Sequence, residues 1–263
     1  MKRLSRKDRT NKEPELPAVP SGGILATLGA YKQNEAIVYE DEKPKGEFRF
    51  LRFYSKKANN AIDVVTSFGS GTQEGHPYLS SKDYLIDVAG APFAIVAEFP
   101  HWITTSPTDF APDRAWLDPQ PWGKSVGDAR VKEGFLALVL FFLEDGAVMG
   151  LAEARGTKAP FVKDYLKAVD KSTTPEGAKA LGQLASAVPP RFRVVGTLRM
   201  VAKSGKFPYA LAHADTRPIA LKEIETLQRW AADEEAQADR EALEALYEKK
   251  VDEIKDLAKA TRE

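Results

Sequence analysis

The pattern of hydrophobic and polar residues between residues 24 and 154 predicts a β-rich domain. The apolar run FLALVLFFL, residues 135–143, has no polar side chain to turn toward water, so we expect a central strand that is buried on both faces. The segment EDGA, residues 144–147, then supplies a tight turn into a second strand of a hairpin. The expected strands span residues 36–39, 47–55, 61–68, 84–89, 92–98, 135–143 and 148–154.

Two polar segments interrupt these strands, at residues 70–83 and 104–128. Connections of this length within a compact domain are usually functional or mobile. The second segment is rich in proline and contains Trp116 and Trp122. These tryptophans either pin the loop to the core or form a platform for stacking or for a binding partner.

Helical spacing follows the β-rich region, and it predicts a helical insertion over about residues 158–188. Phe161 and Tyr165 fall on one helix face after a proline at the entry. Thr174 is a plausible N-cap, and Pro175 fits the first position of a second helix. The next strand is expected to begin at Arg191, within RFRVVGTLRMVAKSGKFPYAL, where apolar and basic residues alternate.

The C-terminal segment, residues 216–263, is predicted to be an acidic amphipathic helix. It contains no glycine, and its apolar residues form two stripes that a polar stretch at residues 233–241 separates. We expect either one long helix or two helices joined near Ala236. Residues 222–263 contain 8 basic and 13 acidic side chains, so this segment is strongly acidic in a chain whose formal net charge is zero.

Composition excludes several kinds of chemistry. The chain has 263 residues and no cysteine, which excludes disulfides, thiolate metal sites and cysteine nucleophiles. The longest apolar run is shorter than the 20 or so residues that a membrane helix needs, and the N-terminus has no apolar core of a secretory signal. We therefore expect a cytoplasmic, intracellular protein with no membrane partner. Residues 1–23 are expected to be a disordered basic arm, either a solvated tail or a contact for a polyanion.

Basic residues concentrate in two predicted strands. Residues 191–206 contain five basic side chains and no acid, and residues 43–57 contain six basic side chains against Glu47 alone. The second segment interleaves its cations with aromatic rings, among them Phe53 and Tyr54. Aromatic rings stack on unpaired bases whatever the sequence, while Lys and Arg follow the phosphates. Alternatively, the aromatic residues build the core and the cations protect strand edges from pairing.

The segments GEFRFLRFYSKK, FLALVLFFLEDGAVMGLAEA and RFRVVGTLRMVAKSGKFPYAL together carry a resemblance of layout over roughly residues 25–215. This layout resembles that of phage- or plasmid-type single-stranded DNA-binding proteins with an OB-fold. The resemblance implies an α+β, β-rich fold, in which residues 24–215 form an elaborated OB-like β-barrel with a helical insertion and a C-terminal helical appendage. Such proteins often end in a disordered acidic tail, whereas this chain ends in a predicted helix. That helix is expected to pack on the β domain, to self-associate, or to cover the basic groove when DNA is absent.

We therefore predict sequence-independent binding of single-stranded DNA in replication or recombination, with RNA left open as a second ligand. No catalysis and no cofactor is expected. The basic side chains would contact phosphates and Tyr54 would stack on a base. The predicted nucleic-acid-binding residues are Arg49, Arg52, Tyr54, Lys56, Lys57, Arg191, Arg193, Arg199, Lys203 and Lys206.

Two other functions are compatible with the sequence. The first is a protein-interaction or assembly module, in which the C-terminal helix forms a homo-oligomer or binds a protein partner. The second is a metal-dependent nuclease that uses loop carboxylates, because Mg²⁺ prefers oxygen ligands. No spacing marks a set of carboxylates, and the three histidines are scattered, which favours structural or surface roles for them.

Overall fold

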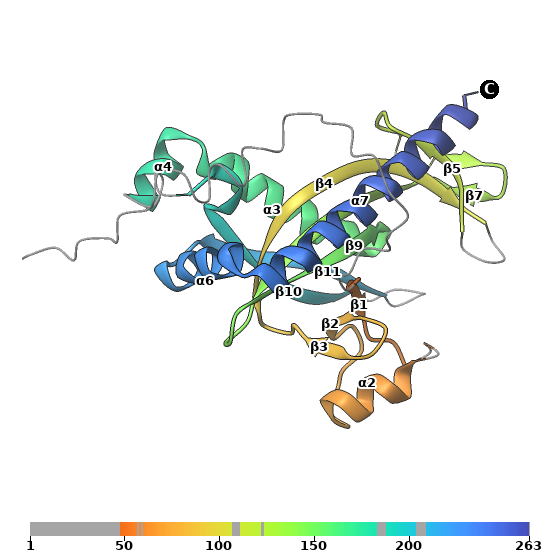
Figure 1. Cartoon of the computed structure of the whole chain (residues 1–263). Coiled ribbons are helices and arrows are strands. Elements are labelled where there is room, and N and C mark those ends of the chain that lie inside the picture. The colour runs from red at the N-terminus through yellow and green to blue at the C-terminus, as the bar shows by residue number, and fades with distance from the viewer. Residues whose placement is uncertain are drawn as a thin grey trace, which may run out of the picture. The chain divides into compact units, whose positions relative to one another are not determined.

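The computed structural model describes residues 48–56, 58, 60–106, 111–121, 124–182, 188–203 and 209–262, which all belong to the compact unit from Val38 to Glu263. The predicted arm at residues 1–23, the predicted strand at residues 36–39 and Trp122 lie outside the described residues. The described part of the chain is α+β and β-rich, which confirms the predicted class at that level. Its main feature is a large, curled sheet flanked by helices (Figure 1).

The sheet has the strand order β11-β10-β4-β8-β9-β1-β2-β3, and β5 pairs with β4 off this path. β6 and β7 form a separate two-stranded sheet. The strands are β1 (Phe50–Phe53), β2 (Pro77–Ser80), β3 (Leu85–Asp87), β4 (Pro92–Thr105), β5 (Pro112–Trp116), β6 (Ser125–Val126), β7 (Ala129–Arg130), β8 (Lys132–Phe142), β9 (Ala147–Arg155), β10 (Val194–Lys203) and β11 (Tyr209–Pro218).

The predicted central strand and its hairpin are confirmed. β8 lies between β4 and β9, and its residues from Gly134 to Phe142 are all buried. β8 and β9 pair antiparallel, and the backbone N–H of Leu143 donates to the carbonyl of Gly146 at 2.8 Å in the turn. An apolar strand without a polar face is stable only when both faces are covered, and helices cover both faces here.

The helices are α2 (Ala61–Phe68), α3 (Ala159–Ser172), α4 (Pro175–Leu181), α6 (Leu221–Ala232) and α7 (Glu234–Ala260), with 3₁₀ turns η2 (Gly156–Lys158) and η3 (Pro190–Phe192). None of these helices is long and apolar enough to span a membrane. α3 and α4 confirm the predicted helical insertion. The predicted cap is confirmed as well, because Thr174 Oγ1 accepts a hydrogen bond from the Gly177 N–H at 3.2 Å.

One face of the sheet packs against α3 through aromatic rings. Phe93 on β4 pairs with Phe141 on β8, and its ring centroid lies 5.7 Å from that of Phe161 and 5.6 Å from that of Tyr165 on α3. A Cβ on Gly196 of β10 would lie only 2.7 Å from the Phe93 ring, so glycine is needed where β10 crosses this cluster. Burial of each aromatic side chain stabilises the fold by about 1.5–3 kcal/mol.

The opposite face of β8 and β9 lies under α7 (Figure 1). Ile254, Leu257 and Ala258 of α7 pack on Ile103 of β4 and Ala115 of β5. Of the three behaviours predicted for the C-terminal helix, packing on the β domain is therefore present in this structure. The helix is also divided, as one prediction allowed, but the division is at Asp233, whose carboxylate caps α7 by accepting from the Glu235 N–H at 2.9 Å.

One strand, two loop segments and one strand boundary need correction. Residues 61–68 form the helix α2, because their apolar positions also fit a helical period and Val64 packs in a cluster with Tyr54 and Tyr78. The polar segments at residues 70–83 and 104–128 are not continuous loops, since they contain β2 and β5. The strand predicted to begin at Arg191 begins at Val194, after η3.

Candidate nucleic-acid interface

The two basic segments lie on strands that are not neighbours in the sheet. β9, β8 and β4 separate β1 from β10. In a flat sheet, β1 and β10 would therefore lie four inter-strand spacings apart, or about 19 Å. A single binding surface therefore requires that the curl of the sheet bring parts of these strands together.

A side-chain contact brings the end of β10 to the end of β1. A Cβ on Gly75, in the loop before β2, would lie 3.0 Å from Cγ of Met200 on β10. The N–H of Gly75 donates to the carbonyl of Tyr54 at 2.8 Å, and Lys56 follows two residues later. Gly75 has a φ of 87°, a conformation that favours glycine. We call this region, formed by Phe53, Lys56, Glu74, Lys158 and Met200, the β1–β10 seam.

The seam holds a lysine that the sequence analysis did not single out. The Lys158 ammonium, on η2, lies 4.2 Å from the centroid of the Phe53 ring. Burial lowers the pKa of Lys158, and the nearby Glu74 carboxylate partly opposes this shift. Glu74 in turn accepts a hydrogen bond from the Lys56 backbone N–H at 2.9 Å, which is the main cause of its lowered pKa. Lys158 joins this group only through tertiary packing, so no local sequence signal marks it.

The predicted residues of β1 divide into two groups. Arg52 is exposed, and its guanidinium lies 5.2 Å from the Phe50 ring centroid; Lys56 is also exposed. Arg49 is mostly buried, and its guanidinium lies 2.6 Å from the Asp239 carboxylate of α7 and 2.7 Å from the Tyr84 hydroxyl. Arg49 therefore links β1 to α7.

Tyr54 does not lie where the stacking prediction requires. Its side chain is 6% exposed, and its ring packs with Val64 and Tyr78 in a core cluster. The chain leaves β1 after Phe53, so strand alternation no longer decides the direction of the Tyr54 side chain. Phe50 and Phe53 are the partly exposed rings of this segment, and each has a cation over it.

The basic residues near β10 have acidic partners from other strands. Arg191 forms an ion pair with Glu98 of β4, and Arg199 Nε lies 2.7 Å from the Asp215 carboxylate of β11. Arg193 Nε is buried without a hydrogen-bond partner among the described residues, and Lys203 is exposed. Arg191 and Arg199 therefore have acidic partners on other strands, although residues 191–206 contain no acid. Lys57 and Lys206 lie outside the described residues.

A different group of charges lies between the sheet and α7. Glu153 of β9 lies 2.7 Å from Lys250 of α7 and 3.1 Å from Arg155. Although burial opposes its charge, the hydrogen bond from Lys250 lowers the pKa of Glu153. His101 is 2% exposed in the same pocket of about 410 Å³, and burial lowers its pKa. These charges hold α7 on the sheet.

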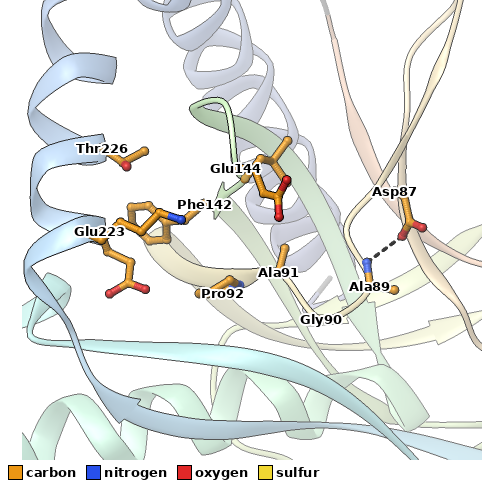
Figure 2. Close-up of a pocket in the computed structure, with 11 residues that line it drawn as sticks. Asp87, Ala89, Gly90, Ala91, Pro92, Phe142, Glu144, Glu223 and Thr226 are labelled. Atoms are coloured by element: carbon orange, nitrogen blue, oxygen red, sulfur yellow. Dashed lines mark hydrogen bonds between the residues drawn. The ribbon is translucent and has the colours of Figure 1, made fainter.

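A second pocket, of about 370 Å³, is lined by Asp87, Glu144 and Glu223 among other residues (Figure 2). Two of these carboxylates have structural roles. Asp87 accepts from the Ala89 N–H at 2.8 Å, and Glu223 accepts from the Ala220 N–H and pairs with Arg217. An acidic lining of this kind repels polyanions, so this pocket is not part of the candidate interface.

Within the described residues, no group of three or more His, Asp or Glu side chains is arranged to hold a metal ion. Comparison of the chain with protein-family models, curated proteins and solved structures gives no match.

Proposed function

We propose that this protein binds single-stranded nucleic acid without sequence preference. The binding surface consists of the β1–β10 seam and the outer face of the β10–β11 hairpin, which is the face that carries Arg199, Lys203 and Asp215. The observation that carries the proposal is the approach of Met200 to Gly75, whose N–H binds the Tyr54 carbonyl, because it brings the ends of the two basic segments together. Met200 faces the other side of β10 from Arg199 and Lys203, so the seam and the hairpin face adjoin around this strand. Arg52, Lys56 and Lys203 are exposed there, and they supply phosphate contacts. The partly exposed rings of Phe50 and Phe53 take the stacking role first given to Tyr54.

The charge balance of this surface also supports the proposal. Its described basic residues are Arg52, Lys56, Lys158, Arg199 and Lys203. Glu74 lies near Lys56 and Lys158, Asp215 pairs with Arg199, and Glu153 of β9 lies near Arg52, so three acids face five cations and the surface stays basic. The Arg199–Asp215 pair is more than half exposed, and exposed pairs contribute only about 0–1 kcal/mol. A phosphate can therefore replace Asp215 as the partner of Arg199 at little cost.

The strand order supports an OB-like arrangement within the larger sheet. The run β11-β10-β4-β8-β9 has the order of a five-stranded OB barrel, with β4 as the first strand, pairing with both the second and the fourth. α3 follows β9, in the place where an OB barrel carries a helix between its third and fourth strands. OB-folds bind oligonucleotides with their second and third strands and with the loops after the first and fourth.

By this correspondence, α7 covers the strands that would form the usual OB ligand face, β8 and β9. The turn between β10 and β11, at residues 204–208, corresponds to the loop after the fourth strand and lies outside the described residues. We therefore assign the phosphate contacts to the hairpin and the seam rather than to the face under α7.

The proposal is tested by fluorescence anisotropy with a labelled dT oligonucleotide of about 30 nucleotides, a length that spans several OB sites. We expect binding whose affinity falls steeply with salt and that duplex DNA does not compete away. Salt-insensitive binding, or no binding at low ionic strength, would contradict the proposal. RNA of the same length measures the preference between the two nucleic acids.

One observation favours the assembly alternative. α7 exposes a groove of about 750 Å³ whose apolar lining includes Phe48, Ala245 and Leu246. Light scattering on Leu246→Lys tests this alternative. If the groove joins two copies, the wild-type mass should exceed that of a monomer and the variant should be monomeric. If the wild-type chain is already a monomer, self-association through this groove does not occur.

A further inference from the structure

The outer face of the β10–β11 hairpin carries a histidine that is held by a carboxylate. His213 on β11 lies directly opposite Arg199 on β10 in the strand register. Its Nδ1 lies 2.8 Å from Oδ2 of Asp164 on α3, and the same oxygen accepts from the Ala214 N–H at 3.2 Å. Residues directly opposite in antiparallel strands have Cβ atoms about 5 Å apart, so the imidazole and the Arg199 guanidinium share one patch of surface.

The Asp164 carboxylate fixes the orientation and the tautomer of the His213 ring. A carboxylate only accepts, so Nδ1 carries the proton that it donates to Asp164. The second ring nitrogen, Nε2, then points away from Asp164. The His213 side chain is 29% exposed, so a ligand approaching the hairpin can reach the ring. The same carboxylate stabilises the ring when it is charged, as in other Asp–His pairs.

We propose that His213 is a phosphate contact of this interface and that it takes up a proton when nucleic acid binds. This inference rests on the proposed function. A phosphate oxygen beside Nε2 requires a donor, and only the charged ring donates from both nitrogens. The phosphate is then held between the imidazolium and the Arg199 guanidinium. Affinity for nucleic acid consequently rises as the pH falls.

Charged groups of the two strands and of α3 surround His213. From the strands, the ring meets Arg199 and Asp215, which pair with each other. α3 carries Lys163 and Lys167 beside Asp164, and Lys163 forms an ion pair with Glu133. Binding replaces Asp215 as the partner of Arg199.

The test is the affinity for the dT oligonucleotide between pH 8 and pH 6 at constant ionic strength. Thymidine and its phosphodiester do not titrate in this range, so a pH effect comes from the protein. The wild-type affinity should rise severalfold, with about tenfold per pH unit as the limit for one linked proton. The affinity of His213→Gln should be lower than that of the wild type at pH 6 and should vary less than about twofold across the range.

Two further variants separate a phosphate contact from a structural role. Asp164→Asn keeps the histidine but removes its partner, so it should reduce the pH effect without removing binding. His101→Gln is the control, because His101 lies beneath α7, away from the hairpin and the seam. This control should keep the wild-type pH profile. Thermal unfolding checks that each variant is folded.

The outcomes distinguish this inference from the proposed function. If the wild-type chain fails to bind the oligonucleotide at every pH, the proposed function itself is wrong. If binding is salt-sensitive but His213→Gln keeps the full pH effect, only the role of His213 is wrong. Loss of the pH effect in His101→Gln would also overturn it.

Discussion

The outer face of the β10–β11 hairpin and the space beneath α7 both place cations next to carboxylates, but they differ in exposure. Arg199 and Asp215 on the hairpin are 53% and 60% exposed, whereas Arg49 and Asp239 at the start of α7 are 11% and 21% exposed. Exposed pairs contribute little to stability and exchange partners readily, while pairs removed from water are costly to break. In the proposed function, the same residue types therefore bind a ligand in one region, whereas they hold a helix in the other.

The largest effect is expected for Arg49, which the sequence placed in the nucleic-acid interface. Arg49→Ala removes hydrogen bonds to Asp239 and Tyr84 and should lower the free energy of unfolding by about 2–3 kcal/mol. Although burial opposes its charge, these hydrogen bonds raise the pKa of Arg49. Urea denaturation measures the loss. Affinity for the dT oligonucleotide, measured on the folded variant, should change less than about twofold. A variant with unchanged stability and much weaker binding would reverse the roles assigned to the two regions.

The next largest effect is the dependence of stability on pH that His101 causes. Burial holds its pKa below the ordinary value of 6.5, so the unfolded chain binds a proton at this position before the folded protein does. Stability is then complete above about pH 6.5 and falls as the pH decreases, by up to about 1.4 kcal/mol per pH unit. Urea denaturation at several pH values should show this slope, and His101→Gln should flatten it. A slope that is the same in both proteins would mean that His101 is not buried beneath α7.

Arg199 should show the smallest effect on stability. Arg199→Ala breaks an exposed pair, so the free energy of unfolding should change by less than about 0.5 kcal/mol. The affinity for single-stranded DNA should nevertheless fall, and the slope of log affinity against log salt should decrease by about 0.7, the contribution of one phosphate contact. An unchanged salt slope would remove Arg199 from the interface.

The sequence predicted those parts of the fold that depend on neighbouring residues. The apolar run in β8, its turn into β9 and the Thr174 cap all depend on local patterns, and the structure contains each of them. α2 was mistaken for a strand because a short apolar run fits both periods, and only its packing on Tyr54 decides between them.

The candidate site depends on contacts between distant residues, which the sequence could not supply. The acids that pair with Arg191 and Arg199 come from β4 and β11, and Lys158 approaches Phe53 only through tertiary packing. The contact between Met200 and Gly75 likewise joins positions far apart in the chain. The sequence therefore marked the basic segments, while the fold decides which of their residues are exposed and which are paired.

The most direct test of the central claim is the affinity of Lys56→Glu/Lys203→Glu for the dT oligonucleotide, beside a matched control. Both lysines are exposed, one at the end of β1 and one at the end of β10, so the folded state should be unaffected. Lys259→Glu is the control, because Lys259 lies on α7 with a side chain that is 76% exposed. We predict that the double variant binds at least about tenfold more weakly and that the control binds like the wild type. Equal affinity in all three proteins would contradict a nucleic-acid interface at the seam and the hairpin.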